Sequence, residues 1–307
     1  MISLAARDIQ HGWARFVLTG VGLGLLIGVT LTMTGVFRGM IDDAQALLTN
    51  SGADLWVVQQ GTQGPYAESS SVKDDVVRGI AGMPGVAAAA NVTYFTMQVR
   101  GAAGEARAMV VGIEPGVSGL PGQPAHLLAG RHLARGHYEA VADAKTGLAL
   151  GERVRIRRHE YEVVGLTQRM VSSGGDPMVF IPLKDAQEAQ FLRDNDAIVN
   201  DRARLAVNPA FNRPAVPGLL DAAQGLQTSS RNVNAVLVRV TEGWQAEQVA
   251  EPIRQWKRLT VYTREGMEEI LVKKLIATSA RQIGMFLVIL AVVSAAVLGL
   301  LILAVLV

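Results

Sequence analysis

The sequence predicts a membrane protein in which α-helical spans flank an external domain of mixed α and β structure. Two apolar runs without a charge, residues 16–37 and 283–307, are each long enough to cross a bilayer as a helix. The segment between them, from Arg38 to Arg281, carries short strand, turn and helix patterns. Half of the chain is apolar and only 18% is charged, a balance that excludes intrinsic disorder.

The composition also excludes several function classes. The chain contains no cysteine, so disulfide scaffolds, thiolate zinc sites and cysteine nucleophiles are ruled out. Its formal net charge is +2, and no basic run interleaved with aromatic residues is present. We therefore expect no nucleic-acid partner.

The first apolar run reads as an uncleaved transmembrane helix. Residues 16–37 would form a helix of about 33 Å, which matches a hydrocarbon core of about 30 Å. A signal peptide is the competing interpretation, but its apolar region would be shorter, and Thr32-Met33-Thr34 is no cleavage site. Arg7 and Arg15 outweigh Asp8 in residues 1–15, so this end is expected in the cytoplasm and the domain outside.

The second run, residues 283–307, returns the chain to the cytoplasmic side. The sequence stops within this run without a polar tail, and we expect a longer protein that has been truncated here. In the first run, glycines recur at steps of four and favour close approach of another helix. These helix-packing candidates are Gly20, Gly24 and Gly28.

Both spans are expected to continue outward as amphipathic stalks, at residues 38–50 and 266–282. Apolar residues recur there at steps of three and four with charged residues beside them. Such stripes fit ordinary packing, and their fusion to membrane spans also fits transmission of motion. The stripe residues are Phe37, Met40, Ile41, Ala44 and Leu48 in the first stalk and Met267, Ile270, Leu271 and Leu275 in the second.

The external segment predicts a succession of short elements. We expect strands at 53–58, 86–99 and 107–113, the last two joined by the Gly101–Gly104 turn. A helix is expected at 72–80, and a glycine- and proline-rich joint follows at 116–124. Residues up to Pro182 are nearly all strand-like and suit a small barrel. A helix at 184–193, a loop at 208–230 and a β-α-β unit over 235–263 complete the domain.

No catalytic motif is found. Glu139–Thr146 imitates a phosphate-binding loop, but Glu139 and Ala144 replace its two glycines. His11, His126, His132, His137 and His159 show no metal-ligand spacing, so solvated or capping roles are expected. The sequence thus predicts no catalytic, cofactor or metal site in this chain.

Several motifs, in their order along the chain, resemble those of one family of membrane proteins. The start, LAARDIQHGWARFVLTGVGLGLLIGV, resembles an interfacial helix with a first span, and GADLWVV at 52–58 resembles a first periplasmic strand. LAGRHL at 128–133, GERV at 151–154, YEVVGL at 161–166 and DPMVFIPLKDAQ at 176–187 follow. The family is that of ABC transporter permeases of the macrolide-exporter (MacB), lipoprotein-release (LolCE) and FtsX-like superfamily. Residues 59–71, QQGTQGPYAESSS, are closest to its heterocyst-exporter (DevC-like) branch.

The resemblance implies a fold and a division into parts. Residues 1–15 would be a cytoplasmic interfacial helix, and residues 51–265 a periplasmic α+β core domain. A porter-like β-α-β lobe would comprise 51–120 and 231–265, with a small β-subdomain inserted at about 121–183 and a helix and loop at 184–230. Two further spans of the family lie outside this sequence.

The resemblance also implies a function: the permease subunit of an ABC transporter in the bacterial inner membrane. Its periplasmic domain would move when a separate ATPase hydrolyses ATP, a mechanism called mechanotransmission. The expected partners are that cytoplasmic ATPase, which carries the ATP and Mg²⁺, a second permease copy, a periplasmic adaptor and membrane lipid. No enzymatic activity is expected in this chain, and the substrate stays open.

Two alternatives remain open at this point. A two-span periplasmic sensor would have the same topology and would signal to a kinase or chemoreceptor module beyond residue 307. An FtsX-like regulator of a cell-wall hydrolase would use the same fold without transporting anything. Sequence beyond residue 307 separates the sensor from the permease, and only a periplasmic partner separates the regulator.

Overall fold

The structure is a computed structural model that describes residues 13–102, 104–117, 119–191, 202–212, 216–225, 232–275, 284–289 and 292–295. The chain forms two compact units. One comprises Met1–Asp42 and Val272–Val307, and the other comprises Asp43–Leu271. The second unit is the folded domain. Residues 192–201 and 226–231 of this domain lie outside the described part.

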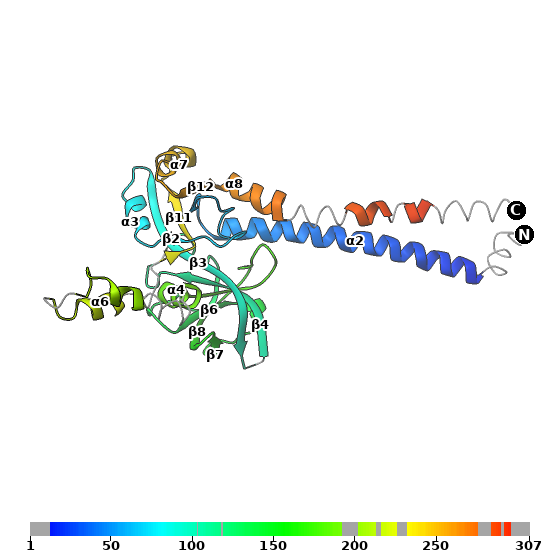
Figure 1. Ribbon diagram of the computed structural model, residues 1–307. Coiled ribbons are helices and arrows are strands. Elements are labelled where there is room, and N and C mark those ends of the chain that lie inside the picture. The colour runs from blue at the N-terminus through cyan, green and yellow to red at the C-terminus, as the bar shows by residue number, and fades with distance from the viewer. Residues whose placement is uncertain are drawn as a thin grey trace, which may run out of the picture. The chain divides into compact units, whose positions relative to one another are not determined.

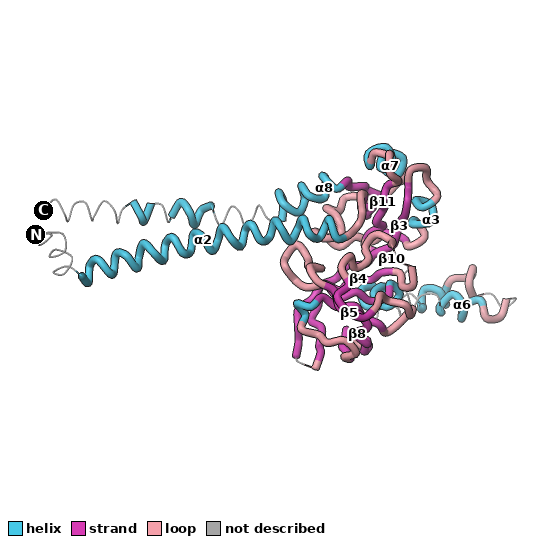
Figure 2. Tube along the Cα trace, turned by 180° about the vertical axis from the view of Figure 1, so that it is seen from behind, coloured by secondary structure: helices cyan, strands magenta, loops and turns pink. Residues whose placement is uncertain are grey.

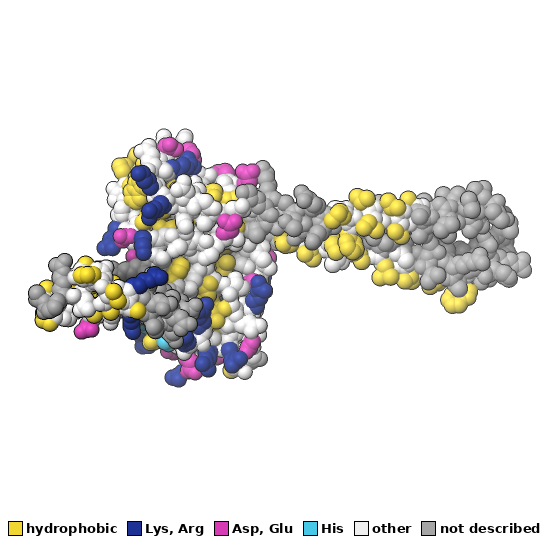
Figure 3. Space-filling model, viewed as in Figure 1, with side chains coloured by type: hydrophobic (Ala, Val, Ile, Leu, Met, Phe, Trp, Pro, Cys, Tyr) yellow, Lys and Arg dark blue, Asp and Glu magenta, His cyan; other side chains and the backbone are white. Residues whose placement is uncertain are grey.

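Helix α2, Trp13–Asn50, is a single helix of 38 residues that contains the expected first span and the first stalk (Figure 1). Large apolar side chains along it are exposed, among them Leu25 at 65% and Leu31 at 67%, and hydrophobic surface follows this helix in Figure 3. It is the one described helix long and apolar enough to cross a membrane. In the expected second span a shorter apolar helical stretch, Gly284–Ala295, is described only in part, and the rest of 283–307 lies outside the described residues.

The domain is built on one mixed sheet whose strand order is β12-β1-β11-β3-β4-β9-β6-β8-β5. Strand β7 pairs with both β3 and β8, and the strands form a continuous band in Figure 2. The strands are β1 Leu55–Gln59, β3 Val86–Gly101, β4 Gly104–Ile113, β5 Leu127–Gly130, β6 Glu139–Asp143, β7 Arg153–Ile156, β8 His159–Thr167, β9 Met178–Pro182, β11 Ala235–Val240 and β12 Leu259–Thr263.

Strand pairing closes one half of this sheet into a six-stranded barrel. The ring runs β3-β4-β9-β6-β8-β7, and Arg100 of β3 opposite Arg155 of β7 closes it. Its interior holds Val110, Val154 and Tyr161 with ten other buried residues. Strands from the stretch up to Pro182 thus take part in a small barrel, but β3 and β4, from the region expected to belong to the porter-like lobe, are needed to complete it.

The other half of the sheet carries two helices on one side. Helices α3, Val76–Ala81, and α7, Ala246–Arg254, lie beside β11 and β12 (Figure 1). A second core forms between them and the sheet, with Val57, Val236 and Ile253 fully buried. Helix α7 contributes the crossover of the β-α-β unit predicted over 235–263, and a capping box of Gln245 and Gln248 starts it.

Two expected elements differ. Val72 and Lys73, predicted in a helix over 72–80, form strand β2, which pairs with β10, Asn232–Val233; pairing across 160 residues overrides local helix propensity. Within the expected loop 208–230, residues Leu219–Gly225 form helix α6. Other elements of the domain are α4 Leu183–Phe191, η1 Ala144–Thr146, α8 Arg264–Glu269 and a helix at 202–207. The π-helical segment η3, Ile270–Leu275, begins in the domain and crosses its boundary after Leu271.

Candidate functional site

The candidate functional site is the junction where the last turns of α2 and the start of α8 are anchored in the domain. On α2, Ala44 and Leu48 of the predicted stalk are 1% and 2% exposed, and Leu47 is buried with them. On the other side, Met267, Ile270 and Leu271 are buried. Five of these residues are among the predicted stripe residues of the stalks, and Leu47 is not. All of them pack into the apolar interior of the domain.

The remaining predicted stalk residues lie in the other compact unit. Phe37, Met40 and Ile41 are half-buried on α2. Leu275 is the last residue of η3, and its side chain lies outside the described part, as do residues 276–282. Burial in the domain thus starts at Ala44 on one helix and ends at Leu271 on the other.

Two polar contacts join the helices within the domain. The Gln45 amide donates to Glu268 Oε1 at 3.2 Å, and the Arg264 guanidinium donates to Thr49 Oγ1 at 2.7 Å. On each helix the two contacting residues are four positions apart, which places them one turn apart on one face. Because the order is reversed, the two segments run antiparallel, in agreement with Figures 1 and 2.

The end of α2 is fixed by its own cap and by the barrel side of the sheet. The Ser51 hydroxyl donates to the Leu48 carbonyl, and Gly52 adopts a φ of +61° that ends the helix. The Asn50 amide donates to the Arg169 carbonyl at 2.9 Å, beyond β8, and Gly122 N–H donates to the Ser51 carbonyl. A displacement of α2 would therefore load segments that continue into β8 and β5.

Helix α8 is linked to the core through the loop that follows β1. Gly64, with a φ of +90°, lies so close to Met267 that a Cβ there would be 2.8 Å from its sulfur, and the Tyr262 hydroxyl donates to the Thr62 carbonyl at 2.7 Å. Tyr66 lies in the same loop, two residues after Gly64, and its hydroxyl accepts from the Trp56 indole N–H at 3.1 Å. The same loop thus touches α8 and the buried strand β1.

The Tyr66 hydroxyl also lies 3.3 Å from the hydroxyl of Tyr94 on β3. Burial raises the pKa of both phenols, so both stay protonated at physiological pH. The chain Trp56, Tyr66, Tyr94 connects β1, the loop and β3. The two tyrosines help line a crevice next to the last turn of α2, whose other walls are Leu47, Asn50, Ser51, Val111, Gly122, Met170, Val171, Met178 and Phe180.

The second helix changes geometry at the domain boundary. Residues 264–269 are α-helical, whereas Ile270–Leu275 form π-helical turns. The sequence predicts one continuous amphipathic helix over 266–282, so this irregularity is a departure from the expectation. Turns of a π-helix are rare in proteins, and those that exist are often found at functional sites. Their hydrogen bonds are shifted from the regular α-helical ladder, which can bend the helix.

The predicted glycine face lies in the compact unit formed by Met1–Asp42 and Val272–Val307. Gly20, Gly24 and Gly28 are all within α2, and a Cβ at any of them would have no neighbour within 4 Å. No described helix therefore packs on this face within one chain. Its proposed role in contact with another span stays a prediction.

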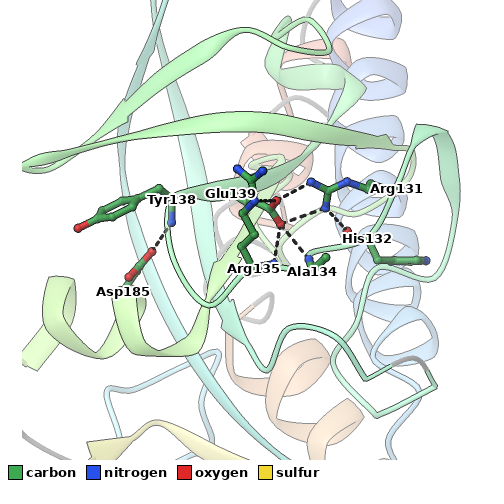
Figure 4. A network of polar contacts seen from close by, with 7 residues as sticks. All are labelled: Arg131, His132, Ala134, Arg135, Tyr138, Glu139 and Asp185. Atoms are coloured by element: carbon green, nitrogen blue, oxygen red, sulfur yellow. Dashed lines mark hydrogen bonds and ion pairs between the residues drawn. The ribbon is translucent and has the colours of Figure 1, made fainter.

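A buried ion network lies elsewhere in the domain (Figure 4). Glu139, 1% exposed, accepts a bidentate pair of hydrogen bonds from Arg131 and the backbone N–H groups of Ala134 and Arg135. Chiefly the hydrogen bonds from Arg131 lower the pKa of Glu139 to about 2. This network explains LAGRHL: Arg131 binds the carboxylate, and Gly130 has a φ of +78° with a Cβ position only 2.3 Å from the Val164 carbonyl oxygen.

The histidines are peripheral in the part of the chain that the structure describes. His126 and His132 are exposed, His137 contacts Asp185, and His159 lies 3.4 Å from Glu188; His11 lies outside the described residues. No group of three described His, Asp or Glu side chains is placed to hold a metal ion. Residues 139–146, the phosphate-loop imitation, are strand β6 followed by η1.

Comparison with known proteins gives a family match and several curated relatives. A model of the MacB-like periplasmic core domain matches residues 16–256. An uncharacterized ABC transporter permease of Mycobacterium tuberculosis is 27% identical over 191 residues, which cover 62% of this chain and 53% of the relative. Another, of Mycobacterium bovis, is 26% identical over 192 residues, with the same coverage of 62% and 53%.

The chain therefore spans about half the length of the curated relatives it matches. Among solved structures, the periplasmic region of MacB from Actinobacillus actinomycetemcomitans is similar with a TM-score of 0.45 and 10% identity. That match covers 76% of this chain and 97% of the other.

Proposed function

This chain belongs to the family of MacB-like periplasmic core domains, and we propose that it is the membrane subunit of an ABC transporter that works by mechanotransmission. The curated relatives are ABC transporter permeases by name. In the proposal, a separate cytoplasmic ATPase hydrolyses ATP, and the permease, as a dimer in the bacterial inner membrane, passes the resulting movement to its periplasmic domain. Export or extraction of a substrate follows from that movement.

The observation that carries the proposal is the course of α2. One regular helix of 38 residues runs through the whole apolar stretch and ends in the domain, with Ala44 and Leu48 almost fully covered. Because each residue of an α-helix is held by hydrogen bonds to the next turn, such a helix transmits an axial or tilting displacement without absorbing it.

The junction supports a specific division of labour between the two helices. The contacts Gln45 to Glu268 and Arg264 to Thr49 hold the helix bases together. They would move as one body with the domain, and the π-helical segment η3 would absorb differences between the two helices just outside it. The N-terminus would be cytoplasmic, and lipid, a second permease copy and a periplasmic adaptor would complete the assembly.

The test uses the full-length permease reconstituted with its ATPase in lipid nanodiscs. Ala44→Pro should abolish coupling between substrate and ATPase rate, because proline inside a helix costs about 3 kcal/mol and bends it. Glu265→Pro is the matched control, since proline is tolerated in the first turn of α8. Unchanged coupling in a folded Ala44→Pro protein contradicts the mechanism.

A crosslink tests the shared base directly. Residues 1–307 contain no cysteine, so in a permease with any cysteine beyond residue 307 replaced by serine, Gln45→Cys with Glu268→Cys gives one defined pair for a short bis-maleimide. If the bases move as one body, the crosslinked permease keeps its substrate-stimulated ATPase rate. A loss of that rate on crosslinking would show that the two bases must slide against each other.

The sensor alternative predicts a different response. A sensor would bind its ligand without any ATPase, and crosslinking experiments would recover a kinase or chemoreceptor module. Family membership and the permease relatives favour the transporter. A regulator of a cell-wall hydrolase would keep the ATPase coupling and release no substrate, so a transport assay separates it from an exporter.

A further inference from the structure

The loop between β5 and β6 is held rigidly at the barrel surface by two buried carboxylates. Glu139 binds Arg131 and the N–H groups of Ala134 and Arg135 at one side. At the other side, Asp185 of α4, 3% exposed, accepts from the Tyr138 N–H at 2.9 Å (Figure 4). Asp185 also contacts the His137 ring. The loop therefore has a fixed shape although most of its side chains are exposed.

This rigid loop presents one guanidinium with unused donors. The terminal nitrogens of Arg131 donate hydrogen bonds to the Glu139 carboxylate and to the His132 carbonyl. Arg135, 72% exposed, approaches Glu139 only through Nε at 3.6 Å, and no described residue accepts from its terminal nitrogens. The backbone of Arg135 is fixed by its N–H hydrogen bond to Glu139, whereas the terminal nitrogens of its guanidinium are exposed to solvent. Such a guanidinium is suited to a bidentate contact with a carboxylate.

An uncovered strand edge lies directly before this loop. Strand β5 ends the sheet and pairs only with β8 among the described residues. Residues 128–130 are exposed, and Leu128, at the irregularity in the β5–β8 register, is 52% exposed. A free edge with apolar side chains offers its unpaired N–H and C=O groups to another extended chain.

The positive charge around the free edge of β5 favours an acidic segment as the strand that pairs with it. Residues 115–138 contain two arginines and three histidines and no acidic residue. Among the carboxylates of neighbouring strands, Glu139 of β6 is buried and its hydrogen bonds with Arg131 are the main cause of the raised pKa of Arg131, to which the charge of Glu162 on β8 adds. An incoming strand with acidic side chains would therefore meet donors rather than like charge.

We propose that an extended acidic segment of a partner protein adds to the free edge of β5, with one of its carboxylates bound by Arg135. A second copy of this chain fits less well, because its own β5 and the residues around it, 115–138, carry no carboxylate that Arg135 could bind. A bilayer surface supplies anions but no backbone to pair with the edge. The proposal concerns a partner-binding surface and does not depend on ATP coupling.

The probe is a fluorescein-labelled peptide, Ser-Val-Glu-Val-Glu-Val-Ser, titrated into the full chain in detergent and followed by anisotropy. We expect binding in the range below about 1 mM, and at least about tenfold weaker binding of the peptide with Gln in place of Glu. A peptide with a central proline should also lose affinity, because it cannot complete the ladder. Hydrogen exchange should slow at residues 127–130 when the acidic peptide binds.

Variants assign the contact. Arg135→Gln should weaken binding of the acidic peptide about three- to tenfold and leave the glutamine peptide unaffected. Arg153→Gln is the matched control: its side chain is 82% exposed, on β7, and should change nothing. Equal affinity of Arg135→Gln and wild type, absence of acidic-peptide binding at about 1 mM, or binding without protection of β5 would each overturn the proposal. So would binding of phosphatidylglycerol vesicles that Arg135→Gln abolishes while the peptide stays unbound.

Discussion

Removing the charge of Glu139 should destabilise the domain and should do so in a pH-dependent way. The carboxylate is 1% exposed and accepts from Arg131, Ala134 and Arg135. In Glu139→Gln, one acceptor oxygen becomes an NH₂ group that faces N–H donors. The substitution keeps the size of the side chain, so the loss reports the charge and its hydrogen bonds rather than a cavity.

The magnitude follows from the pKa. Lowering the pKa of Glu139 from the ordinary 4.5 to about 2 corresponds to about 3 kcal/mol of folding free energy at neutral pH. For the unit Asp43–Leu271, that should lower Tm by roughly 6 to 12 °C. The pKa is depressed in the folded state, so this stability is fully present above pH 4.5 and is lost as the pH falls towards about 2.

The assay is urea unfolding of the full chain in detergent, followed by tryptophan fluorescence. The difference between wild type and Glu139→Gln should be constant above about pH 5 and should shrink at lower pH. Glu160→Gln is the control, since Glu160 is 63% exposed and 3.9 Å from Arg153, and exposed pairs contribute about 0 to 1 kcal/mol. A loss below about 0.5 kcal/mol, or a difference that stays constant down to about pH 3, would refute the assignment.

Three further substitutions test other parts. Gly112→Ala would place a Cβ 2.2 Å from the Ala186 Cβ, so α4 must move and stability should fall by about 1 to 3 kcal/mol; an unchanged Tm would contradict the packing. Tyr66→Phe leaves the Trp56 indole N–H without its acceptor and should cost about 1 to 3 kcal/mol, with a shift in tryptophan emission as its signature. Gly24→Leu should insert normally but reduce permease dimer crosslinking and ATPase stimulation; wild-type values for both would place the interface on another face.

Local patterns were sufficient for much of the domain. The Gly101–Gly104 turn predicts the β3–β4 hairpin, which pairs from Thr93 opposite Gly112 to Gly101 opposite Gly104. The apolar run 235–240 and the stretch 259–263 are strands on either side of α7. In these cases the signal lies within a few residues of the element that it specifies.

Long-range pairing accounts for what the sequence did not predict. β2 exists because Val72 and Lys73 meet Asn232 and Val233, and nothing near residue 72 encodes that partner. Closure of the barrel depends on the length of β3, whose last residues reach β7. A single sequence does not reveal which of its strands will meet in this way.

The buried carboxylate of Glu139 shows the same limit at the level of a side chain. Glu139 precedes an apolar run and looks like the polar start of a strand, yet all five residues of β6 are buried. Its partner Arg131 is eight positions earlier, a separation with no meaning in helix or strand periodicity. A glycine followed by an arginine in LAGRHL was the available signal, and its role becomes clear only from the φ of Gly130 and the geometry of the pair.

The stalks show how burial refines a boundary drawn from charge. Charge places the end of the span at Arg38 and predicts a stalk over 38–50, but burial in the domain starts at Ala44. Residues 38–43, about 9 Å of helix at 1.5 Å per residue, therefore separate the uncharged run from the anchored turns, and the two compact units divide at Asp42 and Asp43. On the other helix the division falls at Leu271 and Val272, inside the π-helical segment. One connection is regular helix and the other is irregular. Under the proposed mechanism, displacement would therefore pass through α2, while the second helix would adjust its length and rotation to follow.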